Sequence, residues 1–400
     1  MAIGDPVTVE GQQCRLWLYR PDGELLERLE WLTDVLGSFD GAEQRIQLRG
    51  VPRRRFEFGH LLVGRDRRTA ENLLHKWQGR PWAVPVWMDA QALAAPLAGG
   101  ATSVPVDTVT RDFVAGGHAV IATDPQTYEV VAIDTVDAAS LTLAAPTAAA
   151  WPAGAEVLPL RAARMPPDGM RQRFTGNGLV ARLAFDCTGS NDWPAATGEA
   201  SYRGHPVIDQ PPNWTEDVPH GWLSKLASLD PSVAQPAWDE EGSGQVTMQT
   251  HRWLLDGRDE IDAFRRWAYA RKGCLGAFWL PTFATDLQVV APIAAAATTI
   301  DVEHAGYTAA VNAGMGRRDL RILTRAGTYW RRVTGSVVLG STTERLAIDS
   351  ALGADVGAGD VLAVSFMDLV RNEADAIELS WWAWNAVEVR ISTRGSRNDL

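Results

Sequence analysis

The stretch from Ala95 to Val106 reads APLAGGATSVPV, and the stretch from Ala291 to Val302 reads APIAAAATTIDV. The two align without a gap at an offset of 196 (from 95 to 291), with apolar residues at matching places. Similarity that returns at a fixed distance along a chain is typical of a repeated structural unit. We therefore interpret the second half of the chain as a second copy of a module that the first half also contains.

Four further pairs of short sequence segments keep the same order along the two halves. They are Trp31–Leu36 with Trp222–Ala227 (offset 191), Leu73–Trp77 with Ala263–Trp267 (190), Glu156–Leu158 with Asp360–Leu362 (204), and Gly189–Ser190 with Gly395–Ser396 (206). The offset changes gradually, as insertions in loops would make it. The alternative is a pair of unrelated β-rich domains of similar composition.

Length and composition limit the number of domains. The chain has 400 residues, of which 46% are hydrophobic, so it can bury substantial cores in two or three domains. The repeat favours two. We expect a first module over residues 1–190, a linker rich in Pro, Gly, Asp and Ser over 191–213, and a second module over 214–400.

The pattern within each module is mainly that of β-strands. Arg45–Arg49 and Phe56–Phe58 alternate polar and apolar residues, as half-buried strands do. One helix is expected in each module, the first over Arg67–Trp77 after Asp66, the second between Gly257 and Gly273. An apolar strand follows each helix, at 82–87 and at 276–281.

The remaining part of each module predicts an insertion. Short strands alternate with Gly, Asp and Thr turns over residues 92–160 and again over 288–364, as in a small β-barrel. The fold class that we predict is mainly β (β+α): two tandem β-sandwich or split-barrel modules, each with one helix and an inserted small barrel-like domain.

Charge and hydropathy exclude several classes of partner. The net charge is −11, from 38 basic and 49 acidic residues, which disfavours nucleic acid. The cluster Arg53–Arg55 indicates a solvated or interface-facing strand rather than a phosphate site. Residues 1–10 lack a signal-peptide pattern and no long apolar run follows, so we expect no membrane insertion. Cys14, Cys187 and Cys274 have no CxxC spacing and are expected to be reduced, mostly buried thiols.

The residues that carry chemistry in enzymes are scattered in this sequence. None of the histidines forms an HExxH or HxH pattern, and neither a P-loop nor a GxGxxG turn is present. Asp239–Glu241 is interpreted as a solvated turn rather than a cation site, and a glycosidase cleft is weighed and disfavoured. We expect no enzyme and no catalytic, cofactor-binding or metal-binding residues. The histidines are His60, His75, His118, His205, His220, His251 and His304.

Tryptophan is unusually frequent, with 17 residues beside only six tyrosines. Trp381, Trp382 and Trp384 lie close together on one predicted strand pair, so their indoles should face both sides. A strand that is wet on one face would not usually carry this pattern, which favours a partner surface.

Several of these segments together resemble a family of phage tail proteins. Asp40–Arg45, Arg53–Glu57 and a helix ending in Trp77–Arg80 resemble the β-belt region of distal tail proteins from long-tailed (siphovirus-like) bacteriophages and gene transfer agents. The second module is similar through Phe264–Gly273, followed by Phe278–Trp279. The resemblance implies a structural virion protein of the tail tip or baseplate, made in the bacterial host cytoplasm. It also implies a ring that joins the tail tube to the hub and fibre proteins, without catalytic residues.

The duplication alters the expected copy number of that ring. A family member is one module used six times, whereas this chain carries two modules. Because a closed ring repeats one interface, three chains would present six quasi-equivalent modules. We therefore expect a trimer with pseudo-six-fold symmetry rather than a hexamer. Two alternatives are a baseplate hub and a carbohydrate-binding accessory tail protein, although the insertions are poor in aromatic residues, with Tyr128, Trp151, Tyr307, Tyr329 and Trp330.

Overall fold

The structure is a computed structural model, and it describes residues 5–23, 25–38, 42–167, 171–224, 226–240, 245–311 and 317–396. It is mainly β, with 52% of residues in strands and 10% in helices, which confirms the mainly-β part of the predicted fold class. Helices α1 (Gly64–Trp77) and α2 (Arg258–Arg271) lie where one helix per module was predicted. A third helix among the described residues, α3 (Tyr307–Ala310), was not predicted; it is four residues long, and the Glu344 carboxylate accepts N–H groups at its start.

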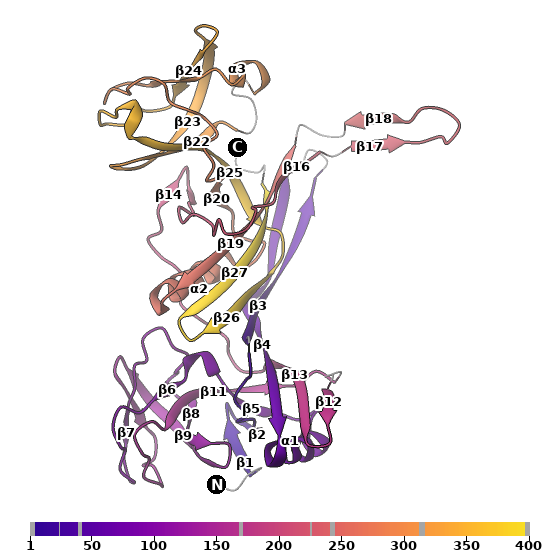
Figure 1. Cartoon of the computed structure of the whole chain (residues 1–400), viewed down its shortest axis with the longest axis vertical. Coiled ribbons are helices and arrows are strands. Elements are labelled where there is room, and N and C mark those ends of the chain that lie inside the picture. Colours follow the sequence, from indigo (N-terminus) through magenta and orange to yellow (C-terminus); the bar gives the residue numbers. More distant parts are fainter. Residues whose placement is uncertain are drawn as a thin grey trace.

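The first half of the chain contains a long hairpin and a set of shorter strands (Figure 1). The strands are β1 (Pro6–Val9), β2 (Gln12–Leu16), β3 (Leu25–Gly37), β4 (Glu43–Val63), β5 (Trp82–Pro85), β6 (Gln91–Ala92), β7 (Ser103–Pro105), β8 (His118–Asp124), β9 (Thr127–Asp137), β10 (Ser140–Leu143), β11 (Glu156–Arg164), β12 (Arg171–Thr175) and β13 (Gly178–Cys187). The apolar strand predicted at 82–87 is shorter, since a 3₁₀ turn over Trp87–Asp89 follows β5.

The second half contains the corresponding strands, with its long hairpin divided into shorter pieces. They are β14 (Ser201–Tyr202), β15 (His205–Pro206), β16 (His220–Leu223), β17 (Leu226–Leu229), β18 (Ala237–Glu240), β19 (Val246–Asp256), β20 (Phe278–Pro281), β21 (Thr299–Glu303), β22 (Asp319–Thr324), β23 (Gly327–Val338), β24 (Thr343–Ile348), β25 (Val361–Asn372), β26 (Ala376–Ala383) and β27 (Ala386–Gly395). A 3₁₀ turn over Ala358–Asp360 precedes β25.

The two halves pair their strands in the same order. Strand β13 lies between β12 and β4, and β27 lies between β26 and β19. Strand β11 pairs with β5, β8 and β13, and β25 pairs with β20, β22 and β27. Inside the insertions, β7–β10–β9–β8 corresponds to β21–β24–β23–β22. The repeat in sequence is therefore matched by a repeat in topology.

Each insertion has a hydrophobic cluster of its own. One cluster is formed by side chains between Leu93 and Val157, and another by side chains between Leu287 and Phe366. The main cluster is larger and contains residues from both halves, including Trp31 and Phe56 from the first and Tyr269 from the second. The two halves thus share one buried core, while each insertion packs around a separate one.

The segment expected to be a linker, 191–213, contains a short hairpin and one bridge to the second half. Within 191–213, β14 and β15 form a hairpin, and Val207 then makes a parallel bridge to Trp279 of β20. The first half has the same arrangement, since the β1–β2 hairpin leads to Leu16, which lies parallel to Ala83 of β5. A Pro-rich composition over 191–213 is compatible with these contacts, because they consist of a two-residue ladder and a single bridge.

Both of these hairpins use the same turn. The central residues are Glu10 and Gly11 in the first half, with φ of 48° and 73°. In the second half they are Arg203 and Gly204, with φ of 47° and 84°. Two consecutive positive φ angles match the twist of a two-residue hairpin, which explains the glycine at the second position.

One sheet runs through both halves and joins them. Its strand order, taken from neighbour to neighbour, is β12–β13–β4–β3–β26–β27–β19–β16. The joining pair is antiparallel, from Glu30 opposite Ala376 to Leu25 opposite Trp381. Figure 1 shows the β3–β4 hairpin rising from the first half to lie beside β26 and β27 of the second.

Candidate assembly interface

The contact between the two halves, which we call the junction, is the best defined interface of the molecule. Beyond the β3·β26 ladder, the Asp375 carboxylate accepts the backbone N–H of Thr33 at 2.6 Å and its hydroxyl at 2.8 Å. Further along the hairpin, Arg371 of β25 donates two hydrogen bonds to the Glu43 carboxylate, at 2.6 and 2.7 Å. A bidentate pair of this kind fixes direction as well as distance.

Helix α2 adds two arginines to the junction. Arg258, its first residue, donates to the Asp89 carboxylate at 2.5 Å and to the carbonyls of Met88 and Thr110 at 3.3 and 2.5 Å. Arg265, two turns further on, donates to the Glu27 carboxylate of β3 at 2.7 Å. Both guanidinium groups belong to the second half, and these four acceptors belong to the first.

Arg265 is also part of a buried ionic network that continues into the first half. Glu27 is 0% exposed and accepts from Arg54 at 2.7 Å as well as from Arg265. Arg54 also donates to Asp112 at 2.5 Å, and Asp112 in turn accepts from Arg161. Burial alone would raise the pKa of the two carboxyl groups, but the guanidinium groups beside them outweigh burial and hold both pKa values low. The carboxylates therefore stay ionised inside the core.

Aromatic side chains surround this network. Trp381 of β26 donates its indole N–H to Glu27 at 3.1 Å, and the guanidinium groups of Arg258 and Arg265 lie 5.5 and 5.9 Å from its ring centre. Trp31 of β3 meets Tyr269 of α2 edge to face, with ring centres 5.4 Å apart. The junction has the composition of a protein interior rather than of a wet domain contact.

The tryptophans near the end of the chain face both sides of their strand, as predicted. Trp381 is 1% exposed, whereas Trp382 is 59% exposed. Trp384 in the following turn is also exposed. The partner surface for Trp381 is the first half of the same chain, and that surface was not identified from the sequence.

The arginine cluster at 53–55 is divided by the alternation of β4. Arg53 is exposed, Arg54 is buried in the ionic network, and Arg55 makes a bidentate pair with Asp186 at 2.6 and 3.0 Å. An interface-facing strand was one of the two structural interpretations of this cluster, and Arg54 fits it.

The seven histidines are also scattered in the structure. The exception is His220, which is close enough to His251 to lower its pKa. His60 and His251 are buried, His75 and His220 are exposed, and His118, His205 and His304 are half-buried. Among the described residues no group of three or more His, Cys, Asp or Glu is placed to hold a metal ion. Within the acidic group, Asp239 is exposed on β18, while the Glu240 side chain and Glu241 lie outside the description.

The cysteines are unpaired and lie inside the protein. Cys14 and Cys274 are buried and Cys187 is half-buried, in agreement with the sequence interpretation. Burial raises the pKa of Cys14 to about 11 and those of Cys187 and Cys274 to about 12. Because only the thiolate is a nucleophile, none of the three is poised to react.

His60 and His251 predict a loss of stability in mild acid. His60 accepts the indole N–H of Trp17 at 3.1 Å, and burial lowers its pKa from 6.5 to about 4. Burial also lowers the pKa of His251 to about 4. Because the unfolded chain binds protons first, stability is complete above pH 6.5 and falls as the pH drops toward 4, by up to about 3 kcal/mol per histidine.

Thermal unfolding at pH 7 and pH 5 checks this. His60→Gln, which keeps an acceptor for Trp17, should show a smaller drop in Tm between the two pH values than the unchanged protein. His75→Ala, on the exposed face of α1, is the control and should leave the drop unaltered. An equal drop in all three proteins would contradict the assignment of His60 as a buried neutral group.

The aromatic residues of the insertions do not form an exposed platform. Tyr128, Trp151 and Tyr307 are buried, and Tyr329 and Trp330 are half-buried. Phe113 of the first insertion is also buried. Stacking on a sugar requires an exposed ring face, so these side chains serve the small cores instead.

No protein-family model matches the chain, and a search of curated proteins finds no match either. None of the described helices has the length and apolar character that a membrane crossing requires.

Proposed function

We propose that this protein belongs to the class of structural proteins that assemble into closed rings from copies of themselves. The observation that carries the proposal is the asymmetry of the junction. Its two sides are different surfaces, β3 with its hairpin on one and β26 with α2 on the other. An interface of this head-to-tail kind leaves an unmatched surface at each end and forms a ring when its rotation closes.

Within that class, we propose a distal-tail-type adaptor ring of a phage tail tip, joining the tail tube to the hub and fibre proteins. The sequence resemblance supports this choice, because it covers the β3–β4 hairpin and both helices. Three chains with two halves each would match a six-fold tube and a three-fold hub. The proposal includes a location in the virion, contact with proteins rather than nucleic acid or membrane, and no catalytic role.

Glycan binding by the insertions is less well supported, because their aromatic side chains are buried or half-buried. The hub alternative predicts the same three-fold order. It would differ in the partner at the tube-facing side of the ring, so co-assembly with tube protein distinguishes an adaptor from a hub.

Mass tests the proposal directly. Light scattering over a range of concentrations should give a species of three times the 43.5 kDa of one chain, and copy counting in purified particles should give three. Six copies in a particle would reject the pseudo-six-fold arrangement. A protein that stays monomeric in the particle and binds soluble glycan would favour the accessory role.

A further inference from the structure

The continuous sheet ends at two strands, each of which pairs on one side only among the described residues. Strand β12 pairs with β13, and β16 pairs with β19. Their counterparts in the opposite halves, β26 and β3, form the junction ladder. The correspondence follows from register. Thr175 lies opposite Gly178 as Ala383 lies opposite Ala386, and Glu27 lies opposite Phe56 as His220 lies opposite Gln249.

We propose that β12 of one chain pairs antiparallel with β16 of the next chain, repeating between chains the β26·β3 ladder seen within one. This inference rests on the proposed function, since it names the surfaces by which the ring closes. The partner is a second copy of this chain. The surfaces are the first-half face of β12 and α1, and the second-half face of β16 and the β17–β18 hairpin.

The junction also fixes the register of the new ladder. Leu379 faces Glu27 within one chain, and the corresponding residues are Arg171 and His220. In the same register Arg173 lies opposite Val218, so the described part of the new ladder joins the start of β12 to the start of β16 and the residues just before it. Pro219, next to His220, does not block this edge. Its carbonyl accepts the backbone N–H of Thr250 in β19, so its missing N–H also falls on the β19 side. The outer edge of β16 therefore remains able to pair.

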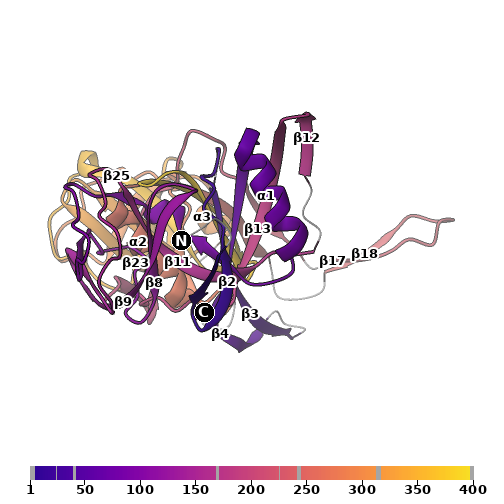
Figure 2. The same ribbon diagram turned by 90° about the horizontal axis from the view of Figure 1, so that it is seen from below.

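The two helices carry the same residues at their starts. Gly64-Arg65-Asp66 corresponds to Gly257-Arg258-Asp259, and both glycines have positive φ, 58° and 99°. In the register of the flanking ladders, Val63 corresponds to Asp256, so Arg65 corresponds to Arg258. Arg258 donates across the junction to Asp89, whereas Arg65 is exposed. Figure 2 shows α1 beside β12 and β13 at the edge of the molecule.

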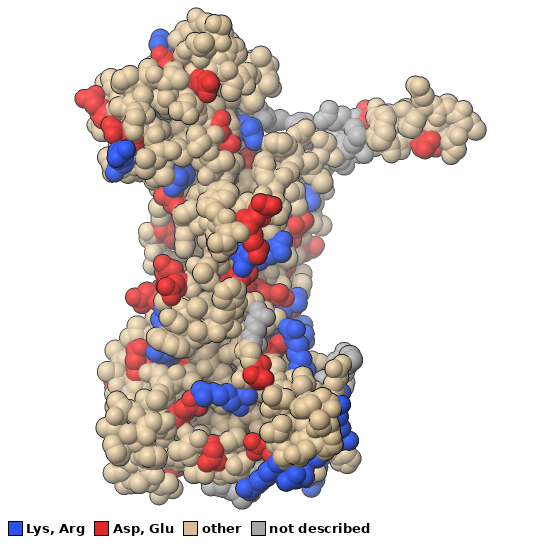
Figure 3. Space-filling model, in the orientation of Figure 1, with Lys and Arg blue, Asp and Glu red and all other residues tan. Residues whose placement is uncertain are grey.

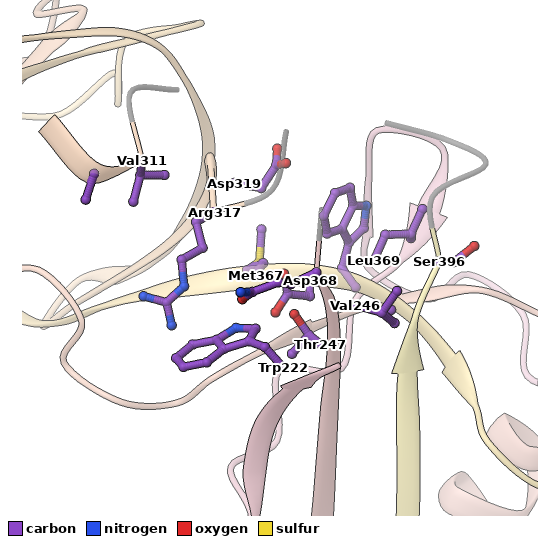
Figure 4. A pocket seen from close by; sticks show the side chains of 14 residues that line it. Trp222, Val246, Thr247, Val311, Arg317, Asp319, Met367, Asp368, Leu369 and Ser396 are labelled. Carbon is purple, nitrogen blue, oxygen red and sulfur yellow. The ribbon is translucent and has the colours of Figure 1, made fainter. Parts of the chain in front are cut away.

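A pocket on the second half lies where the first half holds its buried ionic network. Its volume is about 530 Å³, and Trp222, Thr247 and Asp368 are among its lining residues (Figure 4). By ladder register, Thr247 and Asp368 correspond to Arg54 and Arg161. In the first half, the ionic network is covered by α2 and β26 of the same chain. We assign the cover of the pocket in the ring to α1 and β12 of the neighbouring chain.

Charge at the two faces is complementary. Residues 64–80 and 171–175 contain seven Arg or Lys and two acidic residues, whereas residues 205–239 contain five acidic residues and one lysine. Two of those acids, Asp209 and Glu216, pair with Arg321 and Arg252 of the same chain. Lys and Arg gather over the α1 and β12 end in Figure 3. Asp368 is half-buried at the pocket, and desolvation raises its pKa to about 6 although Arg317 acts to lower it, so an added cation there would be favoured.

The β17–β18 hairpin supports the same partner. It projects from the body in both ribbon views, and Leu229, Val233 and Trp238 are 72%, 93% and 64% exposed. A two-stranded hairpin alone is marginally stable, so a covering surface is expected. The matching part of the β3–β4 hairpin is held by Arg371 through Glu43. The first-half counterpart of Arg371 is Arg164, which is exposed and donates to the Gly79 carbonyl at 3.3 Å; in the ring we expect it to meet an acid such as Asp239.

Cysteine cross-linking of the assembled protein tests the register. Residues directly opposite in an antiparallel ladder have Cα atoms roughly 4.5–5.5 Å apart, within reach of a disulfide. The double variant Arg171→Cys/His220→Cys should therefore give covalent dimers and trimers under mild oxidation, and nothing larger. The control Thr175→Cys/His220→Cys displaces one cysteine by four residues, roughly 13 Å, and should give none.

A charge variant provides a second measurement. Arg65→Glu should weaken association at least about thirtyfold, as loss of a central arginine does in other interfaces, while the monomer keeps its circular dichroism spectrum. Arg325→Glu, in the exposed turn of the second insertion, is the matched control and should assemble normally.

The outcomes separate this inference from the proposed function. Trimers of the correct mass that give no Arg171–His220 cross-link, or that form normally with Arg65→Glu, overturn the β12·β16 contact and leave the ring intact. A chain that remains monomeric in the particle overturns both. Cross-linked species larger than three chains would show that the contact forms but that the ring does not close at three.

Discussion

Replacing Glu27 by alanine is expected to lower the free energy of unfolding by about 3 to 5 kcal/mol. The carboxylate is fully buried and accepts hydrogen bonds from Arg54, Arg265 and the Trp381 indole. Its removal leaves two guanidinium groups in the core without their shared counter-ion, and a charge without a partner is far more costly to bury than a pair. Urea unfolding followed by tryptophan fluorescence measures the change.

Glu378→Ala is the matched control for this variant. Glu378 also lies in the β3·β26 region and pairs with Arg28 at 3.4 Å, but its side chain is 52% exposed. Solvent screens such a pair, so its loss should cost no more than about 1 kcal/mol. If Glu27→Ala proved as mild as Glu378→Ala, the buried network would not be what holds the two halves together.

Replacing Trp381 by alanine is expected to destabilise the chain by about 3 to 5 kcal/mol. The indole fills the space between α2 and β3, donates to Glu27, and lies beneath the guanidinium groups of Arg258 and Arg265. A cavity at this position would remove apolar packing and part of the ionic network together. The effect should appear in thermal unfolding as one cooperative transition at lower temperature.

The neighbouring residue offers a control on the same strand. Trp382 is 59% exposed, so Trp382→Ala should change stability by less than about 0.5 kcal/mol. Equal destabilisation by the two variants would contradict the orientation of β26. Independent unfolding of the two halves in Trp381→Ala, seen as two transitions, would contradict the single cooperative transition that we expect for this variant.

The repeat could be located from the sequence, and in the insertions its register was correct. Leu97 bridges to Trp151 as Ile293 bridges to Val356, and Val104 lies opposite Leu141 as Ile300 lies opposite Leu346. Leu97 with Ile293 and Val104 with Ile300 keep the offset of 196, while their partners, Trp151 with Val356 and Leu141 with Leu346, differ by 205. The two insertions therefore align in structure as their apolar residues align in sequence.

Outside the insertions, the matched sequence segments are aligned with an offset that is wrong by two or three residues, and this has a physical cause. The matched segments Trp31–Leu36 and Trp222–Ala227 have an offset of 191, whereas the strand ladders give 193, from Glu27 to His220. The matched helix segments have an offset of 190, whereas Gly64 and Gly257 also give 193. A shift of two in a strand, or of three in a helix, returns to the same face, so the apolar pattern cannot detect it.

The junction could not be predicted from the sequence. Glu27, Asp112 and Arg265 are far apart along the chain, and only the pairing of β3 with β26 brings α2 over the first half. One local signal was present. Glu27 lies on the same face of its strand as Leu25 and Leu29, and a charge within an apolar face indicates a buried counter-ion. The identical Gly-Arg-Asp at both helix starts was a second signal.

A three-dimensional reconstruction of the assembled ring tests the central claim most directly. The account predicts three chains that present six similar positions, with β12 of each chain against β16 of the next and a β3·β26 junction inside every chain. Six chains in the ring, or three chains in contact through other surfaces with β12 and β16 left at open edges, would contradict it.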